Sequence, residues 1–290
     1  LKNVPFVKDV YSMINVLKAL GSTIQISEKE KKIKIINKKK HNFIVPYKLT
    51  STMRSSVLTM GALLGKYKNF KCALIGGCSL GPRPINYHLN GFEKLGAKYN
   101  LLKGYVNCKA KKLNGNKIDF PKVSVTGTSN LIMASVFANG VTTLKNASIE
   151  PETLDLCQML IKAGANIKFK GKRTIEIKGI KKLNSITHQV IGDRIEAFSY
   201  LCVGAITKGN IKINNINPFY LKSELNILKK IGCNLKIKNN SIEIKNNNKL
   251  KSVKIKTSPW PGFATDNMPM LMAVLTLAKG KSEIIENIFS

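Results

Sequence analysis

The chain alternates amphipathic helical patterns with short strand-like runs, and this order repeats. Four times an amphipathic segment ends at a glycine that is followed directly by a strand-like run, at Gly21, Gly96, Gly164 and Gly232. Each of these glycines lies where the C-terminus of a helix needs a residue in the left-handed conformation. Their separations of 75, 68 and 68 residues predict a repeated structural unit of about 70 residues.

A second helical pattern is apolar on nearly every side. It occurs in residues 131–140, 197–209 and 268–280, with a looser first copy in residues 48–65, and an extended run follows each copy. A helix that is apolar all round has to be buried. We therefore predict an inside-out α/β fold, in which the helices are buried and the sheets lie outside.

The chain is predicted to form two domains. Its 290 residues exceed the size of most single domains. Residues 189–196 lead from a strand into a buried helix, with Asp193 as the expected N-cap and Glu196 as its capping-box partner. We place the boundary here, with a first domain at 1–191 and part of a second at 192–290. Because the chain opens on Leu1 and stops just after a strand-like run, we expect a fragment trimmed at both ends.

The formal net charge of +32 raises the possibility of nucleic-acid binding. The lysines, however, are spread along the whole chain together with many asparagines and isoleucines. There is also no aromatic stacking array, zinc-ligand spacing or helix-turn-helix pattern, so nucleic acid is not expected as the main partner. No apolar run reaches the roughly 18 residues of a membrane span, and no signal peptide is visible. We expect a cytoplasmic protein.

The loop at residues 76–84, Gly-Gly-Cys-Ser-Leu-Gly-Pro-Arg-Pro, is the most distinctive stretch. Its glycines and prolines exclude a regular helix or strand, and the glycines leave the Cys78 thiol accessible. Only four arginines occur beside 44 lysines, so arginine marks positions that need the bidentate grip of a guanidinium on a planar anion. Arg54 and Arg83 lie on either side of Cys78 in the sequence, which predicts a phosphate or carboxylate ligand beside a reactive thiol. A turn with an incidental cysteine stays open as the alternative.

The other five cysteines lie in apolar helix or strand patterns, where a free thiol acts as a small hydrophobic group. We expect these thiols to be hidden, with raised pKa values. No Cys-x-x-Cys pair occurs, so a zinc or thiol-exchange site is not expected, and this cysteine usage is typical of a reducing compartment. The five are Cys72, Cys108, Cys157, Cys202 and Cys233.

Three further positions are candidates for binding or catalysis. Lys122 and the hydroxyl-rich residues after it precede a buried helix, which suits a phosphate cradle, although Ser124 could be an ordinary cap. Asp266 ends a rigid loop that holds the single tryptophan, and it is either the N-cap of the next helix or a general base facing the Cys78 loop. His88 lies five residues after Arg83 and could contact the same ligand.

Together these segments resemble the enolpyruvyltransferase family. The resemblance spans essentially the whole chain in one order and is carried by residues 52–56, 76–84, 122–125, 193–196 and 264–266. It implies two inside-out α/β domains and transfer of the enolpyruvyl group of phosphoenolpyruvate to the 3′-hydroxyl of UDP-N-acetylglucosamine, with release of phosphate. No cofactor or metal is implied. The sister family, 5-enolpyruvylshikimate-3-phosphate synthase, shares the architecture and lacks the Gly-Gly-Cys cysteine.

The resemblance also implies roles for individual residues. Cys78 would be the proton donor to the methylene carbon and the site of covalent adducts with phosphoenolpyruvate and with fosfomycin, and Asp266 would be the base at the 3′-hydroxyl. Arg54 and Arg83 would hold anionic groups. The residues that would contact the UDP-sugar are Arg83, Pro84, Ile85, Asn86, Tyr87, Lys122, Val123, Ser124, Val125 and Ile288.

This chain departs from the family pattern at three places. The Lys-Asn pair that holds phosphoenolpyruvate would lie before Leu1, and further arginines of the pocket would lie after Ser290. Asn86 occupies a position that is usually aspartate. Two alternatives therefore stay open: a degenerate family member that acts as a binding or nucleic-acid-associated protein, and an enzyme of the shikimate type.

Overall fold

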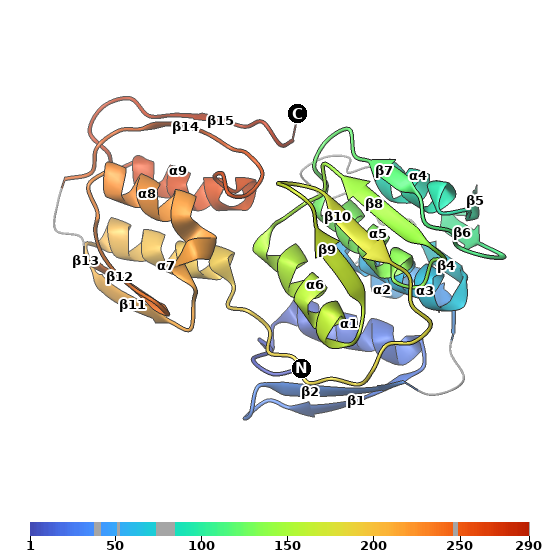
Figure 1. The fold of residues 1–290 in the computed structure, drawn as a ribbon. Helices are drawn as coiled ribbons and strands as arrows, with labels where there is room; N and C mark the ends of the chain where they lie inside the picture. Colours follow the sequence, from blue (N-terminus) through green and yellow to red (C-terminus); the bar gives the residue numbers. More distant parts are fainter. Residues whose placement is uncertain (38–41, 51–52, 74–84, 246–248, 290) are drawn as a thin grey trace. The chain divides into compact units, whose positions relative to one another are not determined.

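The computed structural model describes residues 1–37, 42–50, 53–73, 85–245 and 249–289 (Figure 1). The chain divides into two compact units, Leu1–Val190 and Ile191–Ser290. The boundary that we placed after residue 191 lies one residue from this division.

The first unit contains two four-stranded sheets of the same topology. Their orders are β3-β4-β6-β5 and β7-β8-β10-β9, and in each sheet the first pair is parallel and the other two are antiparallel. An antiparallel pair, β1 with β2, lies beside α1. The elements are α1 (Lys8–Ala19), β1 (Ser22–Ser27), β2 (Lys32–Asn37), β3 (Ile44–Val45), α2 (Tyr47–Thr50), the 3-10 helix η1 (Arg54–Val57), α3 (Leu58–Tyr67), β4 (Asn69–Ala73), α4 (Asn86–Lys94), β5 (Lys98–Leu102), β6 (Tyr105–Lys109), β7 (Lys117–Asp119), α5 (Val125–Ser135), β8 (Val141–Lys145), α6 (Pro151–Lys162), β9 (Asn166–Phe169) and β10 (Ile175–Lys178).

The core of the first unit is built around α3 and α5, which lie in close contact. Met60, Leu64, Leu131 and Ile132 are fully buried in it. A Cβ atom added at Gly61 would lie 2.2 Å from the backbone oxygen of Asn130, so glycine is what allows the two backbones to approach this closely. The prediction that the all-apolar helices are buried is confirmed in this unit.

The second unit has a three-stranded antiparallel sheet, β11-β13-β12, and the parallel pair β14-β15. Helix α7 packs against α9 in its core. The parallel pair matches the start of each sheet in the first unit, as expected for one repeat followed by the beginning of another. The elements are α7 (Arg194–Thr207), β11 (Asn210–Asn214), η2 (Pro218–Leu221), α8 (Lys222–Lys230), β12 (Asn234–Lys238), β13 (Ser241–Lys245), β14 (Lys254–Lys256), η3 (Thr265–Asn267), α9 (Met268–Leu275) and β15 (Glu283–Ile285).

The four periodic glycines have the predicted conformation. Gly21, Gly96, Gly164 and Gly232 have φ values of 100°, 95°, 103° and 104°, which are left-handed values that other residues adopt only under strain. Each reverses the chain directly after an amphipathic helix. The 70-residue period therefore reflects a repeated helix–glycine–strand connection.

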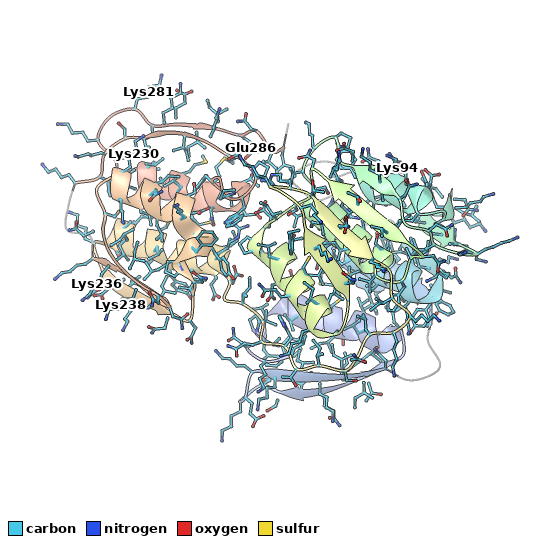
Figure 2. All side chains as sticks on the ribbon, in the orientation of Figure 1. Lys94, Lys230, Lys236, Lys238, Lys281 and Glu286 are labelled. Carbon is cyan, nitrogen blue, oxygen red and sulfur yellow. The ribbon has the colours of Figure 1, made fainter. Side chains whose placement is uncertain are left out.

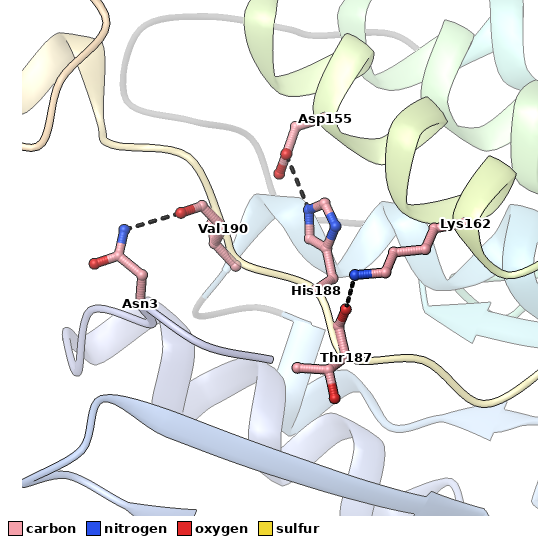
Figure 3. Close-up of polar contacts among 6 residues, drawn as sticks. All are labelled: Asn3, Asp155, Lys162, Thr187, His188 and Val190. Carbon is pink, nitrogen blue, oxygen red and sulfur yellow. Dashed lines mark hydrogen bonds and ion pairs between the residues drawn. The ribbon is translucent and has the colours of Figure 1, made fainter. Parts of the chain in front are cut away.

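The last segment of the first unit is fastened to that unit by side chains (Figure 3). Two of these side chains belong to α6 and one to the N-terminal segment, so residues 187–190 are held before the chain enters the second unit. The contacts are His188 Nε2 with Asp155 Oδ1 at 2.9 Å, Lys162 Nζ with the Thr187 carbonyl at 2.6 Å, and Asn3 Nδ2 with the Val190 carbonyl at 2.9 Å.

Exposed lysines extend from several separate elements (Figure 2). In the described ranges, no helix has the length and apolar character needed to cross a bilayer. The lysines labelled in the figure are Lys94 on α4, Lys230 on α8, Lys236 and Lys238 on β12, and Lys281 before β15.

The N-cap of α7 provides a test of this local structure. Asp193 Oδ1 accepts hydrogen bonds from the backbone N–H groups of Ile195 at 2.8 Å and Glu196 at 3.1 Å, so the predicted cap is confirmed. We expect Asp193→Ala to lower the free energy of unfolding by about 1 kcal/mol, measured by urea denaturation. Asp9→Ala is the matched control, since Asp9 lies in the first turn of α1 without capping it, and it should cost only a few tenths of a kcal/mol. Equal losses in the two variants would contradict the role of the cap.

Candidate functional site

The described residues include candidate site residues from both units. In the first unit these are Arg54, Ile85, Asn86, Tyr87 and residues 122–125, and in the second unit they are Asp266 and Ile288. Cys78, Arg83 and Pro84 lie outside the described residues, so the proposals about them rest on sequence alone.

In the first unit, helix α5 begins at an exposed residue, Val125, and carries no acidic side chain in its first turn. Ser124 is the N-cap, and its Oγ accepts a hydrogen bond from the Gly127 N–H at 3.2 Å. Lys122 is exposed beside it, and Val125 is 41% exposed. The capping interpretation of Ser124 is therefore confirmed. The positive end of this helix, with a lysine nearby, also keeps the character of an anion site.

A buried polar network joins the elements that carry the other candidates of this unit. Asn130 Oδ1 accepts from the Gly61 N–H at 2.7 Å, and its Nδ2 donates to the Val57 carbonyl at 3.0 Å. The same Nδ2 lies 2.7 Å from His88 Nδ1. Because an amide nitrogen only donates, His88 Nδ1 accepts and the ring proton belongs on Nε2. That Nε2 lies 3.3 Å from Thr126 Oγ1 and donates to it.

This network makes His88 a neutral, structural side chain. His88 is 3% exposed, and burial, helped by the positive charge of Arg54, lowers its pKa to about 4. Its contacts connect α4 to the start of α5 and, through Asn130, to the residues that follow Arg54. Sequence reasoning considered His88 as a ligand contact and missed Asn130, whose three partners are 42, 69 and 73 residues away in the chain.

In the second unit, Asp266 is exposed on a short 3-10 turn whose other residues are anchored. Asn267 Nδ2 and the Ala264 N–H donate to Glu224 Oε1 at 3.0 and 3.2 Å. Thr265 Oγ1 donates to Glu286 Oε2 at 2.7 Å. The capping interpretation of Asp266 is wrong, because the 3-10 turn η3 comes before α9 and places Asn267 at the N-cap position. The Asp266 carboxylate is thus presented to solvent by a fixed backbone.

Glu286 holds the backbone of the candidate residue Ile288. Its Oε1 accepts from the Ile288 N–H at 2.5 Å, the Phe289 N–H at 3.0 Å and Thr257 Oγ1 at 3.0 Å. Partial burial acts to raise the pKa of Glu286, but these hydrogen bonds and the one from Thr265 outweigh it and lower the pKa. Sequence reasoning missed Glu286. The one sequence feature that could have indicated Glu286 is the rarity of acidic residues, of which the chain has 16 among 290.

The five cysteines outside the glycine loop are buried, as predicted. Among the described residues there is no group of three or more His, Cys, Asp or Glu side chains arranged to hold a metal ion. Burial raises the pKa to about 12 for Cys72, Cys108, Cys157 and Cys202, and to about 11 for Cys233.

Comparison with known protein families shows which family the chain belongs to. The family model described as EPSP synthase (3-phosphoshikimate 1-carboxyvinyltransferase) matches residues 1–290. The chain belongs to this family of enolpyruvyltransferases. The family expected from the sequence is thereby confirmed.

Curated relatives of this enolpyruvyltransferase chain carry a more specific name. The UDP-N-acetylglucosamine 1-carboxyvinyltransferase of Pelagibacter ubique (strain HTCC1062) is 47% identical over 290 residues, which are 100% of this chain and 69% of the relative. The protein of the same name from Geotalea uraniireducens (strain Rf4) is 42% identical over 289 residues, again 100% of this chain and 69% of the relative. The chain thus spans about two thirds of these relatives.

Solved structures of enolpyruvyltransferases share the fold. The enolpyruvyl transferase NikO from Streptomyces tendae has a TM-score of 0.87 at 18% identity, covering 98% of this chain and 68% of that one. EPSP synthase from Acinetobacter baumannii has a TM-score of 0.70 at 22% identity, covering 94% of this chain and 64% of that one. At these identities the likeness shows the fold alone, and the predicted inside-out α/β fold is confirmed.

The buried histidine predicts a pH dependence of stability. His88 takes up a proton near its ordinary pKa of 6.5 when unfolded but only near 4 when folded. Between these values the unfolded state binds more protons, so stability should fall as the pH is lowered from 6.5 to 4 and lose nothing further from this group below 4. The slope from His88 is at most about 1.4 kcal/mol per pH unit. Urea denaturation across this window should show a steeper fall for the wild type than for His88→Gln, and equal slopes would contradict this assignment.

Proposed function

We propose that this protein transfers the enolpyruvyl group of phosphoenolpyruvate to the 3′-hydroxyl of UDP-N-acetylglucosamine and releases phosphate. The observation that carries the proposal is the similarity, across all 290 residues and at 47% identity, to a relative named UDP-N-acetylglucosamine 1-carboxyvinyltransferase. The Cys78 loop adds support, because the resemblance assigns that cysteine to this branch and not to the shikimate branch. The two units are proposed to be the first domain and part of the second.

The reaction needs a base at the acceptor hydroxyl and an acid at the methylene carbon. Asp266 suits the first role, because an exposed carboxylate on an anchored turn can remove the 3′-hydroxyl proton as the oxygen attacks C2 of phosphoenolpyruvate. Cys78 is proposed to give a proton to C3 in the same addition. The tetrahedral ketal then loses phosphate from C2 and a proton from C3, which restores the carbon–carbon double bond.

The nucleotide is proposed to bind at the first unit. The start of α5 offers backbone N–H groups and a positive helix end to a phosphate, with Lys122, Val123, Ser124 and Val125 around it. Arg54, through its charge at His88, lies close to the same network. Arg83, Pro84, Ile85, Asn86 and Tyr87 are proposed to complete the contacts with the uridine nucleotide.

The proposed reaction suggests a place for the protein in the cell. It is the first committed step of peptidoglycan synthesis and would link the protein to cell-wall biogenesis, and through it to cell shape and cell division. Its substrates are small, charged molecules of the cytoplasm, where we propose that the protein works.

A phosphate-release assay tests the proposed function. The protein expressed from its complete reading frame should release phosphate only when UDP-N-acetylglucosamine and phosphoenolpyruvate are both present. Asp266→Asn should lower kcat by at least about a hundredfold, because the amide cannot accept the proton. Release with shikimate 3-phosphate in place of the UDP-sugar would instead assign the protein to the shikimate branch. Affinity for DNA that persists at about 150 mM salt, without phosphate release, would favour the binding-protein alternative.

Cys78 should be the one cysteine alkylated by fosfomycin, an epoxide, and UDP-N-acetylglucosamine should accelerate the reaction. Thiolate is the reactive form, and burial raises the pKa of the other five cysteines to about 11 or 12. Peptide mapping by mass spectrometry would locate the label. Cys78→Ser should abolish labelling, whereas Cys157→Ser, which changes a fully buried thiol, should leave it unchanged. Label distributed over several cysteines would contradict the assignment.

A further inference from the structure

The turn that carries Asp266 is held from two sides, by two different carboxylates. Glu224, on the first turn of α8, is 1% exposed and accepts from the Ala264 N–H and from Asn267. Glu286, just beyond β15, accepts from the Thr265 hydroxyl. Asp266 itself is the exposed member of the group. Fixed neighbours around one exposed carboxylate are what a positioned base requires.

Glu286, which is labelled in Figure 2, differs from Glu224 in bonding to two separate segments of the proposed sugar site, at Thr265 and at Ile288. Its two oxygens have different partners. Oε2 accepts from Thr265, beside Asp266, at 2.7 Å. Oε1 accepts from the backbone of Ile288 and Phe289, and from Thr257. One carboxylate therefore sets the distance between the Asp266 turn and the Ile288 backbone.

We infer that Glu286 is a positioning residue for the transfer, with Oε2 orienting the turn of the base and Oε1 shaping the backbone that contacts the sugar. This inference rests on the proposed function. Glu286 itself need not touch the substrate. The ionised form accepts all four hydrogen bonds, and charge-assisted bonds of this kind are stronger than neutral ones. Losing the contact at either oxygen should therefore have a distinct kinetic effect.

The contributions of Oε1 and Oε2 of Glu286 can be distinguished by substitution. Glu286→Gln keeps one carbonyl oxygen, which can serve Thr257, Ile288 and Phe289, and places an NH₂ group opposite the Thr265 hydroxyl. Because this NH₂ only donates, the charge-assisted hydrogen bond given by Thr265 is lost, and at most a neutral bond of reversed direction replaces it. Thr265→Val removes the same contact from the other side and keeps the branched shape. We expect each variant to lower kcat by about tenfold while KM for UDP-N-acetylglucosamine changes less than twofold, because small errors in the placement of a reacting group lower the rate.

Three further variants complete the design. Glu286→Ala removes both contacts and should lower kcat and also raise KM for the UDP-sugar by about tenfold. The double variant Glu286→Gln with Thr265→Val should be no slower than either single variant, because both remove one interaction. Glu283→Gln is the matched control. It lies three residues earlier, on β15, and its exposed ion pair with Lys254 (3.0 Å) is separate from the contacts described, so it should have wild-type kinetics.

Steady-state phosphate release by the protein expressed from its complete reading frame, normalised to the folded fraction measured by circular dichroism, decides the outcome. A wild type inactive with both substrates would refute the proposed function itself. An active wild type with unchanged kcat in Glu286→Gln and Thr265→Val would refute the positioning role. That role would also be refuted if these variants lose only thermal stability, or if their effects on kcat multiply in the double variant.

Discussion

The close approach of α3 to α5 is the constraint on which the first unit depends. Two backbones can meet at this distance only where one of them has no side chain, and Gly61 supplies that position. The approach brings the Asn130 amide within 2.7 Å of the Gly61 N–H, and from there within reach of Val57 and His88. Because these bonds are buried, leaving any of them unmade would cost free energy. The packing therefore fixes the relative positions of η1, α4 and α5, which begin at Arg54, Asn86 and Val125.

In the second unit, carboxylates that accept hydrogen bonds, and not a close approach of two backbones, fix the elements relative to one another. The chain has three basic residues for every acidic one. Carboxylates at the ends of helices and turns therefore experience little repulsion from other negative charges. Asp193 caps α7, Glu224 holds the turn before α9 from the core side, and Glu286 holds it from the C-terminal segment. Acidic side chains suit this task because they accept several backbone and hydroxyl donors at once. The network leaves exposed the carboxylate of Asp266, to which the proposed chemistry is assigned.

Much of the fold could be predicted because its determinants are local or periodic. Left-handed glycines after amphipathic helices, apolar helices and the Asp193 cap each depend on residues that are near in the chain, and the structure has all of them. The polar networks could not be predicted, since they also depend on partners that are distant in the chain: Gly61 and Val57 lie 69 and 73 residues from Asn130, and Thr265 and Thr257 lie 21 and 29 residues from Glu286. No pattern within a helix or strand indicates which distant donor will face a given acceptor. Of the two interpretations of Asp266, the N-cap is wrong because a single 3-10 turn shifts the start of the helix.

In the proposed site, the residues that contact ligands can be recognised from the sequence, whereas the residues that position them depend on contacts distant in the chain. Among the described residues, those proposed to contact ligands lie at or near helix starts and turns. The sequence marks the candidates by residue type, as rare arginines or as a cysteine in a glycine-rich segment. The residues that hold them in place are buried or half-buried, and they resemble ordinary polar core residues until their partners are known. Asp266 and Glu286 illustrate the contrast, because both are carboxylates in the same unit and only one is exposed. Hydrogen bonds lower the pKa of Glu286 and commit its lone pairs to the protein. A carboxylate so committed is a poor proton acceptor, which is why Asp266, and not Glu286, is the base of the proposed reaction.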